Sequence, residues 1–206
     1  MLIEFSGIDG SGKSSAADAL AGIAIAAGVA CYQHRLKPPS RRTLSAISEP
    51  LGMSKHQLFG VDAVEAVSAY ELLTMARTSL SDRLDFEIQI VEPYLQACLA
   101  IAHGHGHDNL RAVSAILQRA PQPELSFRLD LPIEAALERI NNRPQGDIAL
   151  IRSGSSRLEA YQRGLIAAEQ QGLYPVVAVD STKATAKEIA GMVWEKVQPM
   201  LRQRAK

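Results

Sequence analysis

The sequence predicts an α/β protein in which a doubly wound, five-stranded parallel sheet is flanked by helices. Short apolar runs alternate with longer segments of helix-favouring residues along the chain, which is the pattern of a parallel sheet with crossover helices. A glycine-rich motif at residues 7–14 directly follows the first apolar run. The 206 residues contain no internal repeat and no low-complexity linker, so we expect one domain over residues 1–206.

The apolar runs and the helix-breaking residues place the elements along the chain. We expect strands at residues 2–6, 29–33, 99–102, 125–131 and 176–179, and helices at residues 13–27, 62–78, 82–96, 109–119, 132–142, 156–171 and 185–206. The polar stretch 40–60, interrupted by Pro50, Gly52 and Gly60, predicts a short helix and loops. Glu4 is unusual because a central parallel strand is normally apolar, so it either pairs with a charge or belongs to the functional site.

The motif at residues 7–14 has the spacing of a phosphate-binding loop: Gly, four residues, then Gly-Lys-Ser. Its glycines let backbone N–H groups turn toward phosphate oxygens, and the helix that follows adds the positive end of its dipole. Lys13 can reach the β- and γ-phosphates, and the Ser14 hydroxyl can ligate Mg²⁺. We therefore expect ATP with Mg²⁺ to bind through Gly7, Asp9, Gly10, Ser11, Gly12, Lys13, Ser14 and Ser15.

Composition and charge exclude several classes of partner. The 22 basic and 22 acidic residues cancel, so no overall field favours nucleic acid or an anionic membrane. No apolar run approaches the length that spans a bilayer, and the first strand starts too early to leave room for a signal peptide. Cys31 and Cys98 are far apart in the chain and are expected to be free thiols. These features predict a cytoplasmic protein.

Arginines outside the loop are candidates for the additional positive charge that phosphoryl transfer needs. Arg143 and Arg152 lie in a Pro- and Gly-containing loop, residues 143–155, suited to close over ATP as a lid. Arg77 either binds the acceptor phosphate in a bidentate manner or forms a structural ion pair. Arg35 follows the second expected strand, at the sheet edge where ligands bind, and Asp9 is expected to contact a substrate hydroxyl or the metal shell.

Three histidines alternate with glycines at positions 103, 105 and 107, and three interpretations are open. In an extended segment, His103, His105 and His107 would project to one side and could bind Zn²⁺, Ni²⁺ or Cu²⁺. His103 alone could act as a base or contact a phosphate. The third interpretation is a flexible loop without chemistry.

Several of these segments together resemble the thymidylate kinase family, within the nucleoside-monophosphate kinases. The resemblance covers most of the chain and rests on four stretches: residues 5–14, 71–77, 90–95 and 124–139. It implies that Asp9 meets the sugar hydroxyl of the nucleotide substrate and that Arg77 holds the acceptor phosphate. It also implies a lid at residues 143–155 and a homodimer, for which the region Val64–Leu95 is the candidate face.

The chain departs from that family at three positions. The family ends its third strand with Asp-Arg-Tyr, and the register chosen here places His103-Gly104-His105 there; Asp82-Arg83-Leu84 resembles that motif but falls within a helical pattern. Leu73 stands where the family has an aromatic residue that stacks on thymine, and Ser6 replaces an acid. The nucleotide half of the site is therefore intact and the acceptor half is altered.

The sequence accordingly predicts an ATP- and Mg²⁺-dependent phosphotransferase acting on a nucleoside monophosphate, thymidylate or a related or modified nucleotide. Lys13, Arg143 and Arg152 are expected to stabilise the transferring phosphoryl group, and Asp9, Arg35, Leu73, Arg77 and His103 to surround the acceptor. Two alternatives are a kinase for a non-nucleotide metabolite and a nucleotide-binding switch that has lost catalysis.

Overall fold

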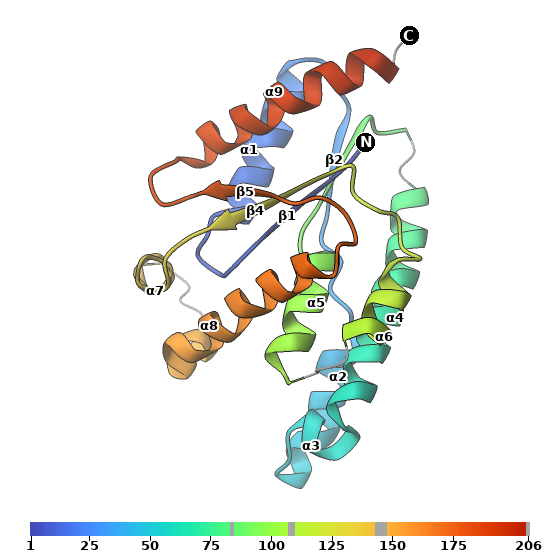
Figure 1. Cartoon of the computed structure of the whole chain (residues 1–206), viewed down its shortest axis with the longest axis vertical. Helices are drawn as coiled ribbons and strands as arrows, with labels where there is room; N and C mark the ends of the chain where they lie inside the picture. Colours follow the sequence, from blue (N-terminus) through green and yellow to red (C-terminus); the bar gives the residue numbers. More distant parts are fainter. Residues whose placement is uncertain (83–84, 107–109, 143–147, 205–206) are drawn as a thin grey trace.

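The computed structural model describes residues 1–82, 85–106, 110–142 and 148–204, with only the backbone described for 148–154. Its centre is a five-stranded sheet with the order β2-β3-β1-β4-β5, and every strand pair in it is parallel. The strands are β1 (Leu2–Gly7), β2 (Cys31–His34), β3 (Ile88–Val91), β4 (Leu125–Asp130) and β5 (Val177–Asp180) (Figure 1). The expected α/β class and five parallel strands are confirmed.

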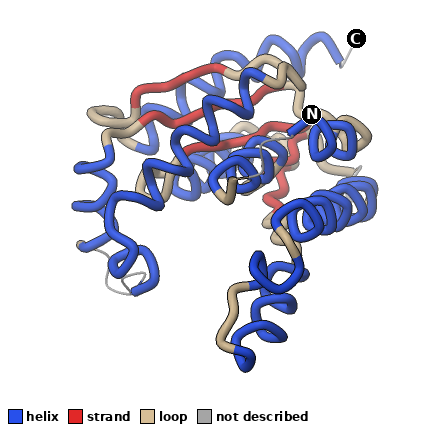
Figure 2. The backbone as a smooth tube through the Cα atoms, turned by 60° about the horizontal axis from the view of Figure 1, so that its bottom comes forward, coloured by secondary structure: helices blue, strands red, loops and turns tan. Residues whose placement is uncertain are grey.

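Helices cover both faces of this sheet (Figure 2). They are α1 (Lys13–Ala26), α2 (Ser40–Ser48), α3 (Lys55–Phe59), α4 (Val61–Ser81), α5 (Leu95–Gly104), α6 (Leu110–Leu117), α7 (Ile133–Asn141), α8 (Ile148–Gln170) and α9 (Ala186–Arg204), with a short 3₁₀ turn at Glu49–Leu51. One apolar cluster joins α1 and α9 to the sheet, and another joins α4, α5 and α6 to its opposite face. This two-layered covering is compatible with a doubly wound fold.

Strand β1 shows how the alternation of side chains divides the core. Ile3 and Phe5 are fully buried against α1 and α9, whereas Leu2 belongs to the cluster on the other face. Glu4 shares that second face and is also fully buried. Its carboxylate accepts hydrogen bonds from the Tyr174 hydroxyl, the Gln96 N–H and the Ser126 hydroxyl. Glu4 therefore belongs to a buried polar network and not to a charge pair.

Burial dominates the protonation of Glu4. It raises the pKa of this carboxyl group to about 7, although the hydrogen bonds from Tyr174, Gln96 and Ser126 act in the opposite direction.

The expected positions of the third strand and the helix before it are wrong. Residues 99–102, expected to be a strand, lie in α5, and the third strand is Ile88–Val91, inside the expected helix 82–96. Leu84, Ile88, Val91 and Leu95 have helical spacing, but a short apolar run fits a buried strand equally well. The acid that follows the third strand is consequently Glu92, and His103-Gly104-His105 lies at the C-terminal end of a helix.

The boundaries of the expected lid are also partly wrong. Residues 148–155 were expected to belong to a loop, but α8 begins at Ile148. Residues 143–147, including Arg143, lie outside the described part of the chain, and so does the side chain of Arg152.

Two other expectations concern membranes and thiols. No helix in the described residues has the length and apolar character needed to cross a bilayer. Cys31 and Cys98 are free thiols, and burial raises the pKa of each to about 11, which disfavours the reactive thiolate.

Candidate functional site

The loop after β1 has a backbone that only glycine accommodates at two positions. Gly7 has φ +141°, and a Cβ there would lie 2.6 Å from the Ser11 hydroxyl oxygen and 2.7 Å from the Leu129 carbonyl oxygen. Gly10 has φ +89°, and a Cβ there would lie 2.8 Å from the Ala136 carbonyl oxygen. Such contacts are too short for a carbon atom. The loop therefore packs tightly against β4 and α7 through the absence of side chains.

This loop leads directly into α1. Gly12, in the left-handed conformation, is the N-cap of α1 and provides no side-chain cap. The first N–H groups of the helix have no partner within the helix, and the dipole makes this end positive. The Lys13 ammonium donates a hydrogen bond to the Ile8 carbonyl at 2.8 Å and lies 3.9 Å from Asp9. Backbone donors and one cation thus gather at the start of α1, as an anion-binding site requires.

The loop opens onto a cavity of about 840 Å³. The lining residues come from the predicted phosphate loop (residues 7–14), the start of α1, the segments after β2 and β3, and α2, α3, α5 and α8. The sequence-predicted residues that line it are Asp9, Gly10, Gly12, Lys13, Ser14, Ser15 and Arg35. The structure therefore brings most of the predicted nucleotide loop together with one predicted acceptor residue.

The carboxyl ends of β2 and β3 place an arginine and a glutamate side by side in this cavity. Arg35 follows β2 and Glu92 follows β3, and a guanidinium nitrogen of Arg35 lies 3.9 Å from a carboxylate oxygen of Glu92. Arg35 is largely exposed, whereas the Glu92 side chain is only 6% exposed. Because the strands are parallel and adjacent, both residues reach the same edge of the sheet as the phosphate loop.

Four further cations line the cavity and were not predicted as site residues. They are Lys37 after β2, Arg41 on α2, Lys55 on α3 and Arg157 on α8, which we call the cationic wall. Partial burial lowers the pKa of Lys55, and the charges of Arg41 and Arg157 lower it further. Arg41, Lys55 and Arg157 come from three separate helices, converge on one space and repel one another.

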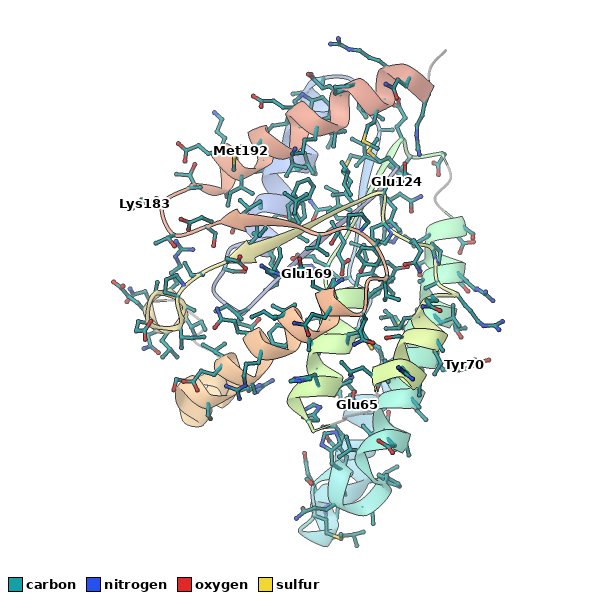
Figure 3. The ribbon with its side chains drawn as sticks, viewed as in Figure 1. Glu65, Tyr70, Glu124, Glu169, Lys183 and Met192 are labelled. Atoms are coloured by element: carbon teal, nitrogen blue, oxygen red, sulfur yellow. The ribbon has the colours of Figure 1, made fainter. Side chains whose placement is uncertain are left out.

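Arg41 is held by a buried polar network. Its guanidinium pairs with Glu65 of α4, which is completely buried (labelled in Figure 3). His56 Nε2 and His105 Nδ1 both reach Glu65 Oε1, at 3.1 and 2.9 Å, and Arg41 Nη1 donates to the same oxygen at 3.2 Å. Burial alone would raise the pKa of Glu65, but the hydrogen bond from His105 and the charge of Arg41 outweigh it and lower the pKa. Glu65 is therefore ionised at neutral pH.

Helix α8 reaches the cavity because it packs unusually close to α5. At Gly164, a Cβ would lie 2.2 Å from the Ala100 carbonyl oxygen, so a larger residue would push the two helices apart. Ala100 and Gly104 of α5 and Arg157 and Tyr161 of α8 line the same cavity. The close helix pair thus forms one of its walls.

Arg139 of α7 holds the loop through hydrogen bonds to backbone carbonyl groups. One of its nitrogens donates to the Gly10 carbonyl at 3.4 Å, and another donates to the Ser181 and Thr182 carbonyls at 2.9 and 3.3 Å. This arginine therefore ties the loop to the segment after β5.

A second, smaller cavity of about 350 Å³ lies beside the ends of β4 and β5 and is lined by Ile8, Asp130 and Thr182, among others.

Several predicted site residues lie elsewhere. Gly7, Ser11, Leu73, Arg77 and His103 are absent from the cavity lining. Gly7, Ser11 and Leu73 are buried. Leu73 is part of the core between α4 and its neighbours. The exposed Arg77 donates to the Arg119 carbonyl at 3.0 and 3.3 Å, which closes the end of α6. These observations favour a structural role for Leu73 and Arg77.

The histidine series is not an extended segment. His103 lies in the last turn of α5, His105 is the C-cap residue, and His107 lies outside the described residues. The expectation that period-two spacing projects the three imidazoles to one side is therefore wrong. His105 lines the cavity, and His103 does not.

A search against models of known protein families finds no match for this chain. Function must therefore be argued from the geometry of the cavity.

Proposed function

We propose that this protein is an ATP- and Mg²⁺-dependent phosphotransferase of the phosphate-loop class, similar to thymidylate kinase, that acts on a small phosphorylated acceptor. One observation carries the proposal. The phosphate loop, with Lys13 and Ser14, opens onto the same cavity as Glu92, Arg35 and the cationic wall. Phosphoryl transfer needs two anionic reactants aligned among positive charges, with little covalent chemistry by the protein.

The loop end of the cavity suits the donor. Backbone N–H groups at the start of α1 would bind the phosphates of ATP, Lys13 would move from the Ile8 carbonyl to the β- and γ-phosphates, and Ser14 would ligate Mg²⁺. Asp9 lies within 3.9 Å of the Lys13 ammonium and lines the cavity, so it can meet a substrate hydroxyl or a water molecule on the metal.

Glu92 takes the place that His103 was expected to fill. It follows the third strand, is shielded from solvent, and lies beside Arg35. A carboxylate there can hold Mg²⁺-bound water or accept the proton of the attacking group. Arg35, whose guanidinium is exposed to the cavity, supplies the cation that an acceptor phosphate requires.

The acceptor is proposed to carry more than one anionic group. The cationic wall adds four cations to Lys13 and Arg35, and one of the four, Arg41, is paired with the buried Glu65. Asp9 and Glu92 are the acids among the described lining residues. Leu73, at the position of a base-stacking aromatic residue in the resembled family, is buried in the core. These two observations favour a modified nucleotide or a non-nucleotide phosphorylated metabolite over thymidylate.

The test is ADP formation from ATP and Mg²⁺ in the presence of a panel of acceptors: ribo- and deoxynucleoside monophosphates, sugar phosphates and sugar bisphosphates. We expect acceptor-dependent ADP formation with at least one member, and its loss in Lys13→Met. Stoichiometric ATP binding without transfer to any member would overturn the proposal and favour a nucleotide-binding switch.

A homodimer that uses α4 remains a prediction. Val67 and Tyr70 of α4 are exposed apolar side chains, and Figure 3 shows Tyr70 on the outer side of that helix. The candidate region Val64–Leu95 also contains β3, which is buried inside the sheet, so this strand cannot contribute to the face. Sedimentation of the protein at micromolar concentration distinguishes monomer from dimer.

A further inference from the structure

Two histidines and a glutamate from three helical segments converge beside the cavity. His56 comes from α3, Glu65 from α4 and His105 from the end of α5. His56 Nε2, His105 Nδ1 and a carboxylate oxygen of Glu65 all lie within 4.8 Å of one another, and the centroids of the two imidazole rings are 4.2 Å apart. These residues are separated by up to 49 positions in the chain, so local sequence does not produce their convergence.

Two of the three ligand separations are close to those expected around one metal ion. Zn²⁺ binds imidazole nitrogen and carboxylate oxygen at about 2.0–2.2 Å, so tetrahedral ligands lie roughly 3.3 Å apart. The nitrogen-to-oxygen distances here are 2.9 and 3.1 Å. The two imidazole nitrogens lie within 4.8 Å of each other, so binding the ion would require the two rings to adjust their positions. His105 is a helix C-cap residue and α3 has five residues, so both imidazoles lie on short or terminal segments that can make this adjustment.

The burial and the contacts of Glu65 fix the carboxylate in place. Glu65 is completely buried, and Arg41 donates to both of its oxygens, Nη1 to Oε1 at 3.2 Å and Nη2 to Oε2, which holds its orientation as outer contacts do at metal sites.

We propose that His56, Glu65 and His105 bind one divalent transition-metal ion, with Zn²⁺, Co²⁺ or Ni²⁺ as the fitting class. Imidazole ligands select these ions over Mg²⁺, which prefers oxygen, so the site is distinct from the Mg²⁺ position at Ser14. Three protein ligands leave one coordination position for water or an anion. His105 and Arg41 line the cavity, so that position adjoins the space assigned to the acceptor.

The surrounding charges set how the site behaves. Arg41 and Lys55 are close to Glu65, and their charges oppose a dication, whereas an anion in the cavity offsets them. Metal and anion are therefore expected to strengthen each other's binding. The metal proposal does not rest on the proposed phosphotransferase activity, because binding is measured without ATP or acceptor.

The test is calorimetric titration of tag-free, chelator-treated protein with Zn²⁺, together with the visible absorption spectrum of the Co²⁺ form. His56→Gln and His105→Asn are the informative variants, because a side-chain amide can still donate to Glu65 but is a poor ligand for these ions. His103→Asn, on the same helix as His105 and outside the cluster, is the matched control.

We expect one Zn²⁺ per chain in the wild-type protein and in His103→Asn, with binding weakened at least about 100-fold in each ligand variant, beyond the effect of losing an outer contact. Zn²⁺ should also raise the melting temperature of the wild-type protein, and the Co²⁺ form should show the intense bands of a tetrahedral site. Equal affinity in all variants, or no stoichiometric binding by the wild-type protein, would overturn the proposal. If a variant fails to fold, the wild-type Zn²⁺ stoichiometry and Co²⁺ spectrum decide.

Discussion

The two sides of the cavity are built from different parts of the chain in different ways. The phosphate loop is one contiguous stretch of eight residues in which backbone groups are the proposed ligands and glycines remove obstacles. The cationic wall consists of four side chains from the β2–α2 segment, α2, α3 and α8. The first can be recognised in the sequence, whereas the second exists only once the chain has folded. Substitutions that obstruct the backbone should therefore disrupt the loop, and removal of individual charges should weaken the function of the cationic wall.

The largest effect is expected from Gly7→Ala. The new Cβ would overlap the Ser11 hydroxyl oxygen and the Leu129 carbonyl oxygen and would stand at φ +141°, so the free energy of unfolding should fall by at least about 3 kcal/mol. Gly12→Ala is the matched control, because its φ of +93° is also positive but no atom lies within 4 Å of the added carbon. Urea unfolding measures both. Equal losses would show that conformation alone, and not packing against β4, explains the need for glycine at position 7.

A pH-dependent effect is expected at Glu4, on the strand that carries the loop. Its pKa is about 7 in the folded protein and 4.5 as the ordinary value, so folding favours the protonated form. The resulting loss of stability is absent below pH 4.5, grows as the pH rises toward 7, and is complete above it. Glu4→Gln should therefore gain stability relative to wild type, by about 2–3 kcal/mol between pH 5 and pH 8. Parallel stability curves for the two proteins would contradict this account.

Glu92→Gln tests the acid after β3. If Glu92 holds metal-bound water or accepts a proton, turnover should fall by about 10²-fold or more, with ATP binding retained. Glu87→Gln is the matched control because Glu87 precedes the same strand at the opposite edge of the sheet, where its carboxylate accepts the Ala30 N–H. Steady-state ADP formation with the best acceptor measures both variants. Equal rates in the two would remove Glu92 from the mechanism.

The smallest expected effect distinguishes two arginines. Arg157→Ala should raise the KM for the acceptor about tenfold, the cost of losing one charge-assisted hydrogen bond, and should leave the KM for ATP nearly unchanged. Arg77→Ala should alter neither constant, because Arg77 contacts the Arg119 carbonyl on the surface. An effect of Arg77 that exceeds that of Arg157 would restore the acceptor role that the sequence resemblance implies.

The α/β fold and the position of the glycine-rich loop between β1 and α1 could be predicted from sequence because their signals are local. The apolar runs at the first, second, fourth and fifth strands and the spacing of residues 7–14 each lie within a short window. The third strand was missed because Ile88–Val91 is four residues long and its apolar positions also fit a helix. That error displaced the acid after the strand from Glu92 to the region of His103.

The remaining site residues had no signal that a single sequence could provide. Arg41 and Lys55 lie in a polar stretch that resembles an ordinary surface segment, and their convergence depends on how α2 and α3 pack against α4. Arg157 lies in a helix that was expected, at residues 156–171, but the sequence alone did not show that this helix packs beside α5 and brings Arg157 to the cavity. Side chains from separate elements meet through tertiary packing, and the hydrophobic periodicity of the sequence does not reveal which elements pack together.

The central claim is that the phosphate loop binds ATP, and calorimetry tests it most directly. Titration of ATP with Mg²⁺ into the wild-type protein and into Lys13→Ala measures the affinity before any acceptor is known. We predict one ATP per chain at micromolar affinity, dependent on Mg²⁺ and weakened at least about tenfold in Lys13→Ala, since a hydrogen bond to a charged group contributes about 1.5–3 kcal/mol. No binding by the wild-type protein, or the same affinity in the variant, would contradict the assignment of this loop.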